Sequence, residues 1–394
     1  MKNTPKESEK GARALDAADA GRFSFTTVKR VVVKIGSNVL TESGGLNEKV
    51  IRAISRQTSQ LMDAGVEVIL VSSGAMASGI RKIGLSKRPD EIPKRQAVAA
   101  VGQAGLILAY EKSLARFGKK VAQILLTGED LGNRKRYLNT RNTFSTLLSW
   151  NIIPIINEND TVAVESIKFG DNDHLSAMIT LLLDADLLIN LTDIEGLFDK
   201  DPRSYADACL IPTVKSIGRH IQKMAGDIPG ALGTGGMSTK IKAARKVTMA
   251  GIPMVIARGD KPDILKKLFD GESHGTFFAP KTQRLSSRKC WIAFNTKRQG
   301  GLRLDPGAAR AVLKGGKSLL PSGVVEVLGD FPVGASVEVI SEDQKVIGAG
   351  LVNYCAADIR KIMGLKTSRI KTALGQKTYD EVIHRDNLAV TCQG

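Results

Sequence analysis

The sequence of 394 residues is poor in the side chains on which most metal and acyl-transfer sites depend. It has four cysteines and four histidines, and the cysteines form no C-x-x-C pair and have no histidine at metal-ligand spacing. A disulfide framework and a zinc site are therefore disfavoured, and free thiols in a reducing cytosol are expected. No convincing Ser-His-Asp or Cys-His arrangement is present, which disfavours acyl transfer through a side-chain nucleophile.

The chain also lacks an uninterrupted apolar run long enough to cross a bilayer. The best candidate, residues 175–191, is broken by Asp184 and Asp186. The first 25 residues are polar and partly acidic, unlike a signal or transit peptide, and we expect residues 1–25 to be a disordered extension. These features predict a cytoplasmic protein without a membrane partner.

Positive charge, in contrast, is abundant. The formal net charge is +17, and residues 281–394 carry 18 basic and 10 acidic side chains. Such an excess is typical of proteins that bind nucleic acid. In this segment, however, basic and acidic residues are interspersed and few aromatic side chains are available to stack on bases, so RNA binding is the less favoured alternative.

The spacing of apolar residues predicts an α/β protein. The runs Val31–Ile35 and Val66–Val71 are typical of buried strands, and between them residues 47–64 place apolar side chains on one helical face. A strand–helix–strand unit of this length gives parallel strands with helices on the faces of the sheet. The same reasoning predicts further strands over 121–126, 152–156, 187–191 and 254–257, and a helix over 174–183.

Polar or glycine residues follow each of the main predicted strands. They are Gly36 and Ser37, Ser73 to Ala75, Asn157 to Asp160, and Thr192 with Asp193. Because the carboxyl ends of neighbouring parallel strands open onto one crevice, these residues predict a ligand site there. Lys34, inside the first strand, is costly to bury unless it meets an anion; the alternative is a surface lysine at a strand end.

A glycine-rich segment, Gly233–Lys240, stands directly before a helical pattern. Its glycines let backbone N–H groups converge, the helix adds the positive end of its dipole, and Lys240 adds a full charge that we expect to face the surface. The segment predicts a phosphate-binding loop, with a plain flexible loop as the alternative. Asp173 is either an N-cap or a site carboxylate, and the neighbouring His174 has no visible partner. Phosphoryl transfer fits this set best.

The pattern changes near Gly275. From Cys290 onward, short β-like runs are separated by turn residues, with a helical stretch near Gly307–Leu313. The runs are Trp291–Ala293, Val324–Leu328, Ser336–Ile340 and Val346–Val352. We expect residues 26–280 to form one domain and residues 281–394 a second, smaller and mostly β domain.

Six motifs in order along the chain resemble those of the amino acid kinase family, in particular its glutamate-phosphorylating members with a C-terminal PUA domain. The motifs are V-V-V-K-I-G-S-N-V-L from Val31, V-S-S-G-A from Val71, N-E-N-D from Asn157, F-G-D-N-D from Phe169, L-T-D from Leu191 and G-T-G-G-M-S-T-K from Gly233. They cover roughly residues 28–260, and residues 281–394 resemble the PUA domain. The resemblance implies a three-layer sandwich with a largely parallel central sheet, followed by a small mostly-β domain.

The resemblance also implies a reaction. The γ-phosphate of ATP, supplied with Mg²⁺, would pass to the side-chain carboxylate of L-glutamate and give L-glutamyl 5-phosphate, the first step of proline biosynthesis. This carboxylate is already ionised at neutral pH, so no catalytic base is needed. Feedback inhibition by proline and a homo-oligomer, dimer or tetramer, are further expectations. Acetylglutamate, aspartate, carbamate and UMP remain alternative acceptors within the family.

Carried over residue by residue, the resemblance gives each motif a role. Lys34 and Lys240 would neutralise charge on the transferring phosphoryl group, and Asp173 would hold the two lysines in place. The acceptor would be bound by Ser73, Gly74, Ala75, Asp160, which would pair with the ammonium, and Asn172, which would hydrogen-bond a carboxylate. ATP would be bound by Lys34, Gly36, Ser37, Thr192, Asp193, Thr234, Gly235, Gly236, Met237, Ser238, Thr239 and Lys240. No carboxylate cluster identifies a protein-held metal site.

Overall fold

A computed structural model describes residues 25–42, 45–162, 172–226, 236–281 and 285–391. Phe169–Asp171, Thr234, Gly235 and the predicted extension up to residue 24 lie outside this part of the chain. Phe25, which we had assigned to the extension, is buried, and its ring centroid lies 6.0 Å from that of Phe269. Residue 25 therefore belongs to the packed part of the chain.

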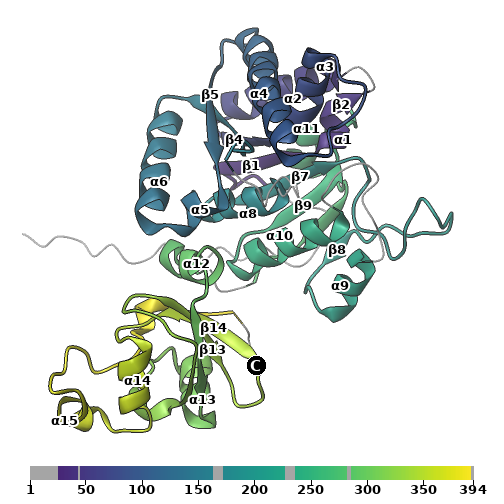
Figure 1. The fold of residues 1–394 in the computed structure, drawn as a ribbon. Coiled ribbons are helices and arrows are strands. Elements are labelled where there is room, and N and C mark those ends of the chain that lie inside the picture. The colour runs from purple at the N-terminus through teal and green to yellow at the C-terminus, as the bar shows by residue number, and fades with distance from the viewer. Residues whose placement is uncertain (1–24, 43–44, 163–171, 227–235, 282–284, 392–394) are drawn as a thin grey trace, which may run out of the picture.

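The part of the chain up to residue 281 has one large sheet with helices on both sides, together with a separate two-stranded sheet (Figure 1). In order, its elements are β1 Arg30–Ile35, α1 Ser37–Leu40, β2 Thr41–Glu42, β3 Gly45–Leu46, α2 Glu48–Asp63, β4 Glu67–Ser72, α3 Ala75–Ile83, α4 Ile92–Ala115, β5 Lys120–Leu126, α5 Gly128–Gly132, α6 Arg134–Ser149, β6 Ile152–Glu158, α8 Asn172–Leu182, β7 Leu187–Thr192, β8 Thr213–Val214, α9 Arg219–Gly226, α10 Met237–Met249, β9 Met254–Arg258, α11 Ile264–Phe269 and β10 Thr276–Phe278. The strands and helices predicted with both bounds in this region are present within two residues of their expected ends, whereas α10, expected to follow Lys240, already begins at Met237.

The sheet has the strand order β5-β6-β4-β1-β7-β9-β10-β8. All neighbouring strands run parallel except β9 and β10, which are antiparallel. The predicted largely parallel sheet is thereby confirmed. Because β6, β4, β1 and β7 are consecutive in this order, their carboxyl ends lie along one stretch of a single sheet edge.

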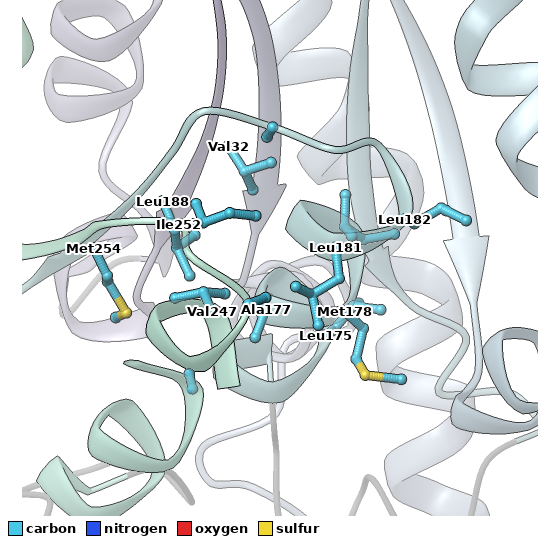
Figure 2. Close-up of a cluster of buried hydrophobic side chains, with 14 of the residues drawn as sticks. Val32, Leu175, Ala177, Met178, Leu181, Leu182, Leu188, Val247, Ile252 and Met254 are labelled. Atoms are coloured by element: carbon cyan, nitrogen blue, oxygen red, sulfur yellow. The ribbon is translucent and has the colours of Figure 1, made fainter. Parts of the chain in front are cut away.

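Along β1, alternate side chains belong to two separate hydrophobic cores, one on each face of the sheet. On one face Val31, Val33 and Ile35 pack against α2, α4 and α11. On the other face Val32 of β1 and Leu188 of β7 pack against α8 and α10, as Figure 2 shows through Leu175, Leu181 and Val247. Helix, sheet and helix therefore form three layers, because both faces of a parallel sheet must be covered.

The C-terminal part is a separate five-stranded sheet of order β12-β11-β13-β14-β15, with its own core. Its elements are β11 Gly300–Leu304, α13 Pro306–Gly315, the 3-10 turn Pro321–Gly323, β12 Val324–Leu328, β13 Ser336–Ile340, β14 Val346–Leu351, α14 Ala356–Ile362, the 3-10 turn Thr367–Arg369, α15 Ile370–Leu374, the 3-10 turn Arg385–Asn387 and β15 Leu388–Val390. The expected small, β-rich second domain is confirmed.

One predicted strand is wrong. Trp291–Ala293 lies inside a helix, α12 Ser287–Phe294, which stands between the two sheets (Figure 1). Ile292 of α12 shares a core with α8 and α10 on one side and with Ala349 and Ala389 on the other. Trp291 donates its indole N–H to the carbonyl of Leu131 at 3.1 Å. A short helix buried from two sides shows no polar face in the sequence, so it resembled a buried strand.

Across the described part of the chain, none of the helices combines the length and the apolar character that crossing a bilayer requires. Cys209, Cys290 and Cys355, the cysteines in the described part of the chain, are not joined to one another by disulfides.

Candidate active site

The register of the central strands brings two polar side chains to one point. Lys34 of β1 stands directly opposite Asn190 of β7, and both lie on the same sheet face as Val32 and Leu188, the face that packs against α8. Both side chains are buried, with 5% and 0% of their residue surface exposed. The first turn of α8, which starts at Asn172, lies over this point and supplies the anion that a buried lysine requires.

That anion is Asp173. Its Oδ1 lies 2.6 Å from Nζ of Lys34 and accepts a hydrogen bond from Asn190 at 2.8 Å. Its Oδ2 lies 3.3 Å from Nζ of Lys240 and accepts from Oγ1 of Thr239 at 2.6 Å. A single carboxylate thus bridges two buried lysines that lie far apart in the sequence.

The electrostatics of Asp173 follow from this arrangement. Burial alone would raise the pKa of Asp173, but the charges of Lys34 and Lys240 and the hydrogen bonds to its oxygens hold that pKa well below its usual range. Asp173 is therefore ionised throughout the working pH range. With two ammonium groups against one carboxylate, the centre keeps an excess positive charge, which suits the negative oxygens of a phosphoryl group.

Four interpretations from the sequence are wrong. Lys34 is not a surface lysine, and Lys240, which we expected to face the surface, is 6% exposed. Asp173 is not an N-cap, because it lies inside the first turn of α8 and its oxygens bind four other side chains. His174 does have a partner: its Nδ1 lies 2.7 Å from Nζ of Lys246.

Several residues expected to bind ATP lie at the start of α10. Gly236 precedes the helix, and Thr239 and Lys240 in its first turn reach Asp173. Past the end of β7, Asp193 accepts from the hydroxyl of Thr192 at 3.0 Å and from the amide of Asn38 at 2.8 Å. Burial raises the pKa of Asp193, but these hydrogen bonds and the charge of Lys240 outweigh it and lower the pKa.

The expected acceptor side lies at the ends of β4 and β6. The side-chain amide of Asn172 donates to Oγ of Ser73 at 2.8 Å and to Oδ1 of Asn157 at 2.9 Å. Its own Oδ1 is buried and has no hydrogen-bond partner among the described residues. Gly74 begins α3 with φ of +104°, a conformation that favours glycine, and a Cβ there would lie 3.0 Å from Leu46.

Asp160 follows β6 in the same region and differs from Asp173 in its electrostatics. Burial raises the pKa of Asp160 to about 6, and the charge of Arg88 offsets part of this effect. Because the charge of Arg88 offsets only part of the effect of burial, the carboxylate of Asp160 is suited to bind a cationic group of a ligand.

Other predicted residues lie at the same edge without a side-chain hydrogen bond to the central carboxylate. Gly36 and Ser37 follow β1, with the N–H of Gly36 bonded to the carbonyl of Leu191 at 2.9 Å. Ala75 starts α3, and Met237 and Ser238 start α10. The N–H of Gly36 is therefore already occupied, whereas the other four residues stand in the first turns of helices, where backbone N–H groups have no partner within the helix.

Sequence reasoning missed three residues of the site: Asn190, Asn157 and Asn38. Asn190 had the clearest signal, because it is a polar residue inside the otherwise apolar run Leu187–Leu191. A fully buried amide in a central strand must find a partner. Asn157 belonged to a motif of which only Asp160 was assigned a role, and Asn38 lies one residue past Ser37.

The site does not fit a protein-held metal ion. Among the residues that the structure describes, no three histidine, cysteine or acidic side chains come together. Asp173 is occupied by two lysines, an arrangement that disfavours a further cation. We therefore assign no Mg²⁺ ligand to this chain.

Comparison with known proteins shows the family of the chain. The sequence pattern of the amino acid kinase family matches residues 29–258, and that of the PUA domain matches residues 300–374. The glutamate 5-kinase of Syntrophus aciditrophicus is 52% identical over 363 residues, which cover 92% of this chain and 94% of the relative. The glutamate 5-kinase of Thermoanaerobacter sp. strain X514 is 49% identical over 93% of this chain and 98% of its own length. The UMP kinase structure from Bacillus anthracis aligns with a TM-score of 0.44 and 15% identity, covering 64% of this chain and 96% of that one.

A carboxylate-bridged lysine pair at the carboxyl edge of a parallel sheet places positive charge as phosphoryl transfer requires. The chain belongs to the amino acid kinase family, carries a C-terminal PUA domain and is a phosphotransferase.

Proposed function

We propose that the protein transfers the γ-phosphate of ATP to the side-chain carboxylate of L-glutamate and forms L-glutamyl 5-phosphate. The observation that carries the proposal is the bridge from Lys34 through Asp173 to Lys240, which provides buried positive charge and no base. A carboxylate acceptor needs no base, since it is ionised at neutral pH. The names of relatives near 50% identity over more than 90% of the chain support glutamate as the acceptor.

In this proposal the two lysines stabilise charge that develops on the phosphoryl oxygens. Loss of one such preorganised donor costs about 10²–10³ in turnover in well-studied enzymes. Asp173 is a positioning residue: it keeps both ammonium groups at fixed places when no substrate is bound. ATP enters with its Mg²⁺ held by the phosphates, and Thr192, Asp193 and the start of α10 bind the nucleotide.

The acceptor side recognises glutamate through Asp160 and Asn172. Asp160 pairs with the ammonium of glutamate. The hydrogen bonds of Asn172 change the part that we assign to it, because its amide N–H groups already serve Ser73 and Asn157. Its open Oδ1 is an acceptor, so we propose that Asn172 also receives a hydrogen bond from the ammonium instead of donating to a carboxylate.

The wider context is proposed from the same resemblance. It comprises a cytoplasmic role as the first enzyme of proline biosynthesis, inhibition by proline, assembly into a homo-oligomer, a kinase domain at residues 26–280 and a PUA domain at residues 281–394.

The decisive experiment measures ADP release from Mg-ATP with L-glutamate and, in parallel, with acetylglutamate, aspartate, carbamate and UMP. Hydroxylamine is included to trap an acyl phosphate as its hydroxamate. Hydroxamate with glutamate alone supports the reaction and the acceptor together. Use of another acceptor would contradict the assignment of Asp160 and Asn172, and use of none would make the RNA alternative the leading one.

A further inference from the structure

A cavity of about 360 Å³ lies where the two sheets of the molecule meet. Its walls come from α8 and α10 of the kinase core, from α12, and from β13 and β14 of the C-terminal domain (Figure 1). Its volume is in the range of pockets that bind small organic molecules. None of the site residues predicted from the sequence except Thr239 lines it.

The charges around this interdomain cavity are strongly unequal. Four basic side chains, Lys242, Arg245, Lys246 and Arg298, line it together with one carboxylate, Glu338. Lys242 and Arg245 are exposed on α10, and neither forms an ion pair with a residue that the structure describes. Unpaired Lys and Arg side chains beside a concave surface are the usual receptors of phosphate.

The other two basic groups are held in place by contacts with neighbouring residues. The guanidinium of Arg298 donates to the carbonyl oxygens of Ile292 at 2.8 Å and Ala293 at 2.6 Å, which leaves its charge uncompensated by these contacts. Nζ of Lys246 lies 2.7 Å from Nδ1 of His174. Burial and the charge of Lys246 lower the pKa of His174 to about 4, so the imidazole is neutral at pH 7 and acts as an acceptor.

The remaining wall is apolar. Met249 of α10, Phe294 of α12, and Val346 and Ala349 of β14 line it. A cavity with a cationic rim and an apolar wall fits a ligand that joins a phosphate to an organic body, and fits bare inorganic phosphate less well.

The cavity is also adjacent to the catalytic centre. Thr239 lines it and donates to Asp173, and His174 lines it next to Asp173 in the chain. A ligand in the cavity therefore touches the first turns of both helices that carry the lysine–carboxylate bridge. Small shifts of these turns change the distance between Asp173 and Lys240.

We propose that the interdomain cavity binds a small organic phosphate through Lys242, Arg245 and Lys246, and that its occupancy changes the turnover of the kinase site. Phosphate binding in the cavity is independent of the proposed function, whereas the effect on turnover rests on it.

The test uses the full chain and isothermal titration calorimetry with ribose 5-phosphate, AMP and inorganic pyrophosphate as probes. The variant Lys242→Ala/Arg245→Ala removes the two unpaired charges. Its matched control is Lys49→Ala/Arg52→Ala, which removes the same pair at the same spacing from the exposed face of α2, on the opposite side of the sheet. Lys240→Met identifies any binding at the kinase site.

We expect at least one organic phosphate to bind, and to lose about tenfold or more in affinity in Lys242→Ala/Arg245→Ala but not in the control. Inorganic pyrophosphate should bind more weakly than the organic probes. Equal affinity in both double variants, loss in Lys240→Met alone, or binding of a short single-stranded RNA but of none of the small phosphates would overturn the proposal. ADP release with and without the bound probe then tests the effect on turnover. If glutamate is not phosphorylated at all, the effect on turnover and the proposed function fail, but phosphate binding in the cavity does not.

Discussion

The side-chain amide of Asn190 donates to Oδ1 of Asp173 at 2.8 Å, and the same oxygen lies 2.6 Å from Nζ of Lys34. Asn190 and Lys34 stand opposite each other in adjacent strands, so the sheet itself fixes the place at which the carboxylate is held. The orientation of Asp173 therefore depends on a residue that touches no substrate in our proposal.

The first prediction concerns this relationship. Asn190→Leu keeps the approximate volume but removes the donor to Asp173, so the carboxylate loses one of the groups that orient it. We expect kcat to fall about tenfold or more while the KM for ATP changes little, because the loss concerns positioning in the transition state. Steady-state kinetics with ATP and glutamate measure both constants.

Thr248→Val is the matched control for Asn190→Leu, because it also removes a buried hydrogen bond, from Thr248 to the carbonyl of Ala244, but neither residue contacts the carboxylate of Asp173. Equal losses in both variants would indicate a general effect of destabilisation. An unchanged kcat in Asn190→Leu would contradict the positioning role.

Lys34 and Asn190 also show which parts of the site could be predicted from the sequence. A charge inside the β-branched run Val31–Ile35 has few explanations, and the expected anion proved to be Asp173. Asn190 gave a weaker signal because an amide is less costly to bury than a charge, and its partner is 17 residues away in the chain. Only the register of β1 and β7 shows that the two polar residues face one point.

The parts that could not be predicted depend on how distant elements pack. The helix α12 was mistaken for a strand because its residues Cys290 to Ala293 are buried from two sides, which removes the polar face that marks a helix. The interdomain cavity likewise depends on the docking of β13 and β14 beside α10. The parallel direction of the main strands, in contrast, could be predicted from the strand–helix–strand pattern of the sequence.

The second prediction separates the roles of the central charges. Lys240→Met should lower kcat about 10²–10³-fold with little effect on unfolding, because Asp173 keeps Lys34, Asn190 and Thr239 as partners. Asp173→Asn should also lower kcat, but it leaves two buried ammonium groups without a counter-charge and should destabilise the fold by about 3–5 kcal/mol. Urea unfolding and steady-state kinetics measure the two effects separately.

Lys49→Met serves as the control for Lys240→Met, since Lys49 is exposed on α2 and belongs neither to the kinase site nor to the interdomain cavity. Near-normal turnover of Lys240→Met would refute its catalytic role. A stability of Asp173→Asn equal to that of the parent protein would show that the two lysines do not require the carboxylate.

The third prediction is a pH dependence of glutamate binding. The pKa of Asp160 is raised to about 6 by burial, so the carboxylate is ionised at pH 7.5 and becomes protonated as the pH falls below 6. Because protonated Asp160 cannot pair with the ammonium of glutamate, we expect the KM for glutamate to rise about tenfold per pH unit below 6. Asp160→Asn should show a high KM that no longer changes over this range.

Stability gives an independent check on Asp160. A carboxyl group whose pKa is raised on folding stabilises the folded state while it is protonated, and this contribution is lost as the pH rises through about 6. The melting temperature of Asp160→Asn should therefore exceed that of the parent protein by more at pH 8 than at pH 5. The opposite trend would mean that Asp160 is stabilised as an anion by the protein.

The last prediction concerns the boundary between the domains. Trp291 is buried, donates to Leu131 and packs with its ring centroid 6.2 Å from that of Tyr137, so α12 covers part of the kinase core. A chain ending at residue 280 exposes this surface, whereas a chain ending at residue 299 keeps α12 in place. We expect the longer truncation product to melt about 5 °C or more above the shorter one, since removal of a buried tryptophan costs about 3–5 kcal/mol. Circular dichroism gives the melting curves, and hydroxamate formation shows whether either product retains activity. If the two products melt at the same temperature, α12 does not stabilise the kinase core, and the boundary at residues 280 and 281 stands as predicted from the sequence.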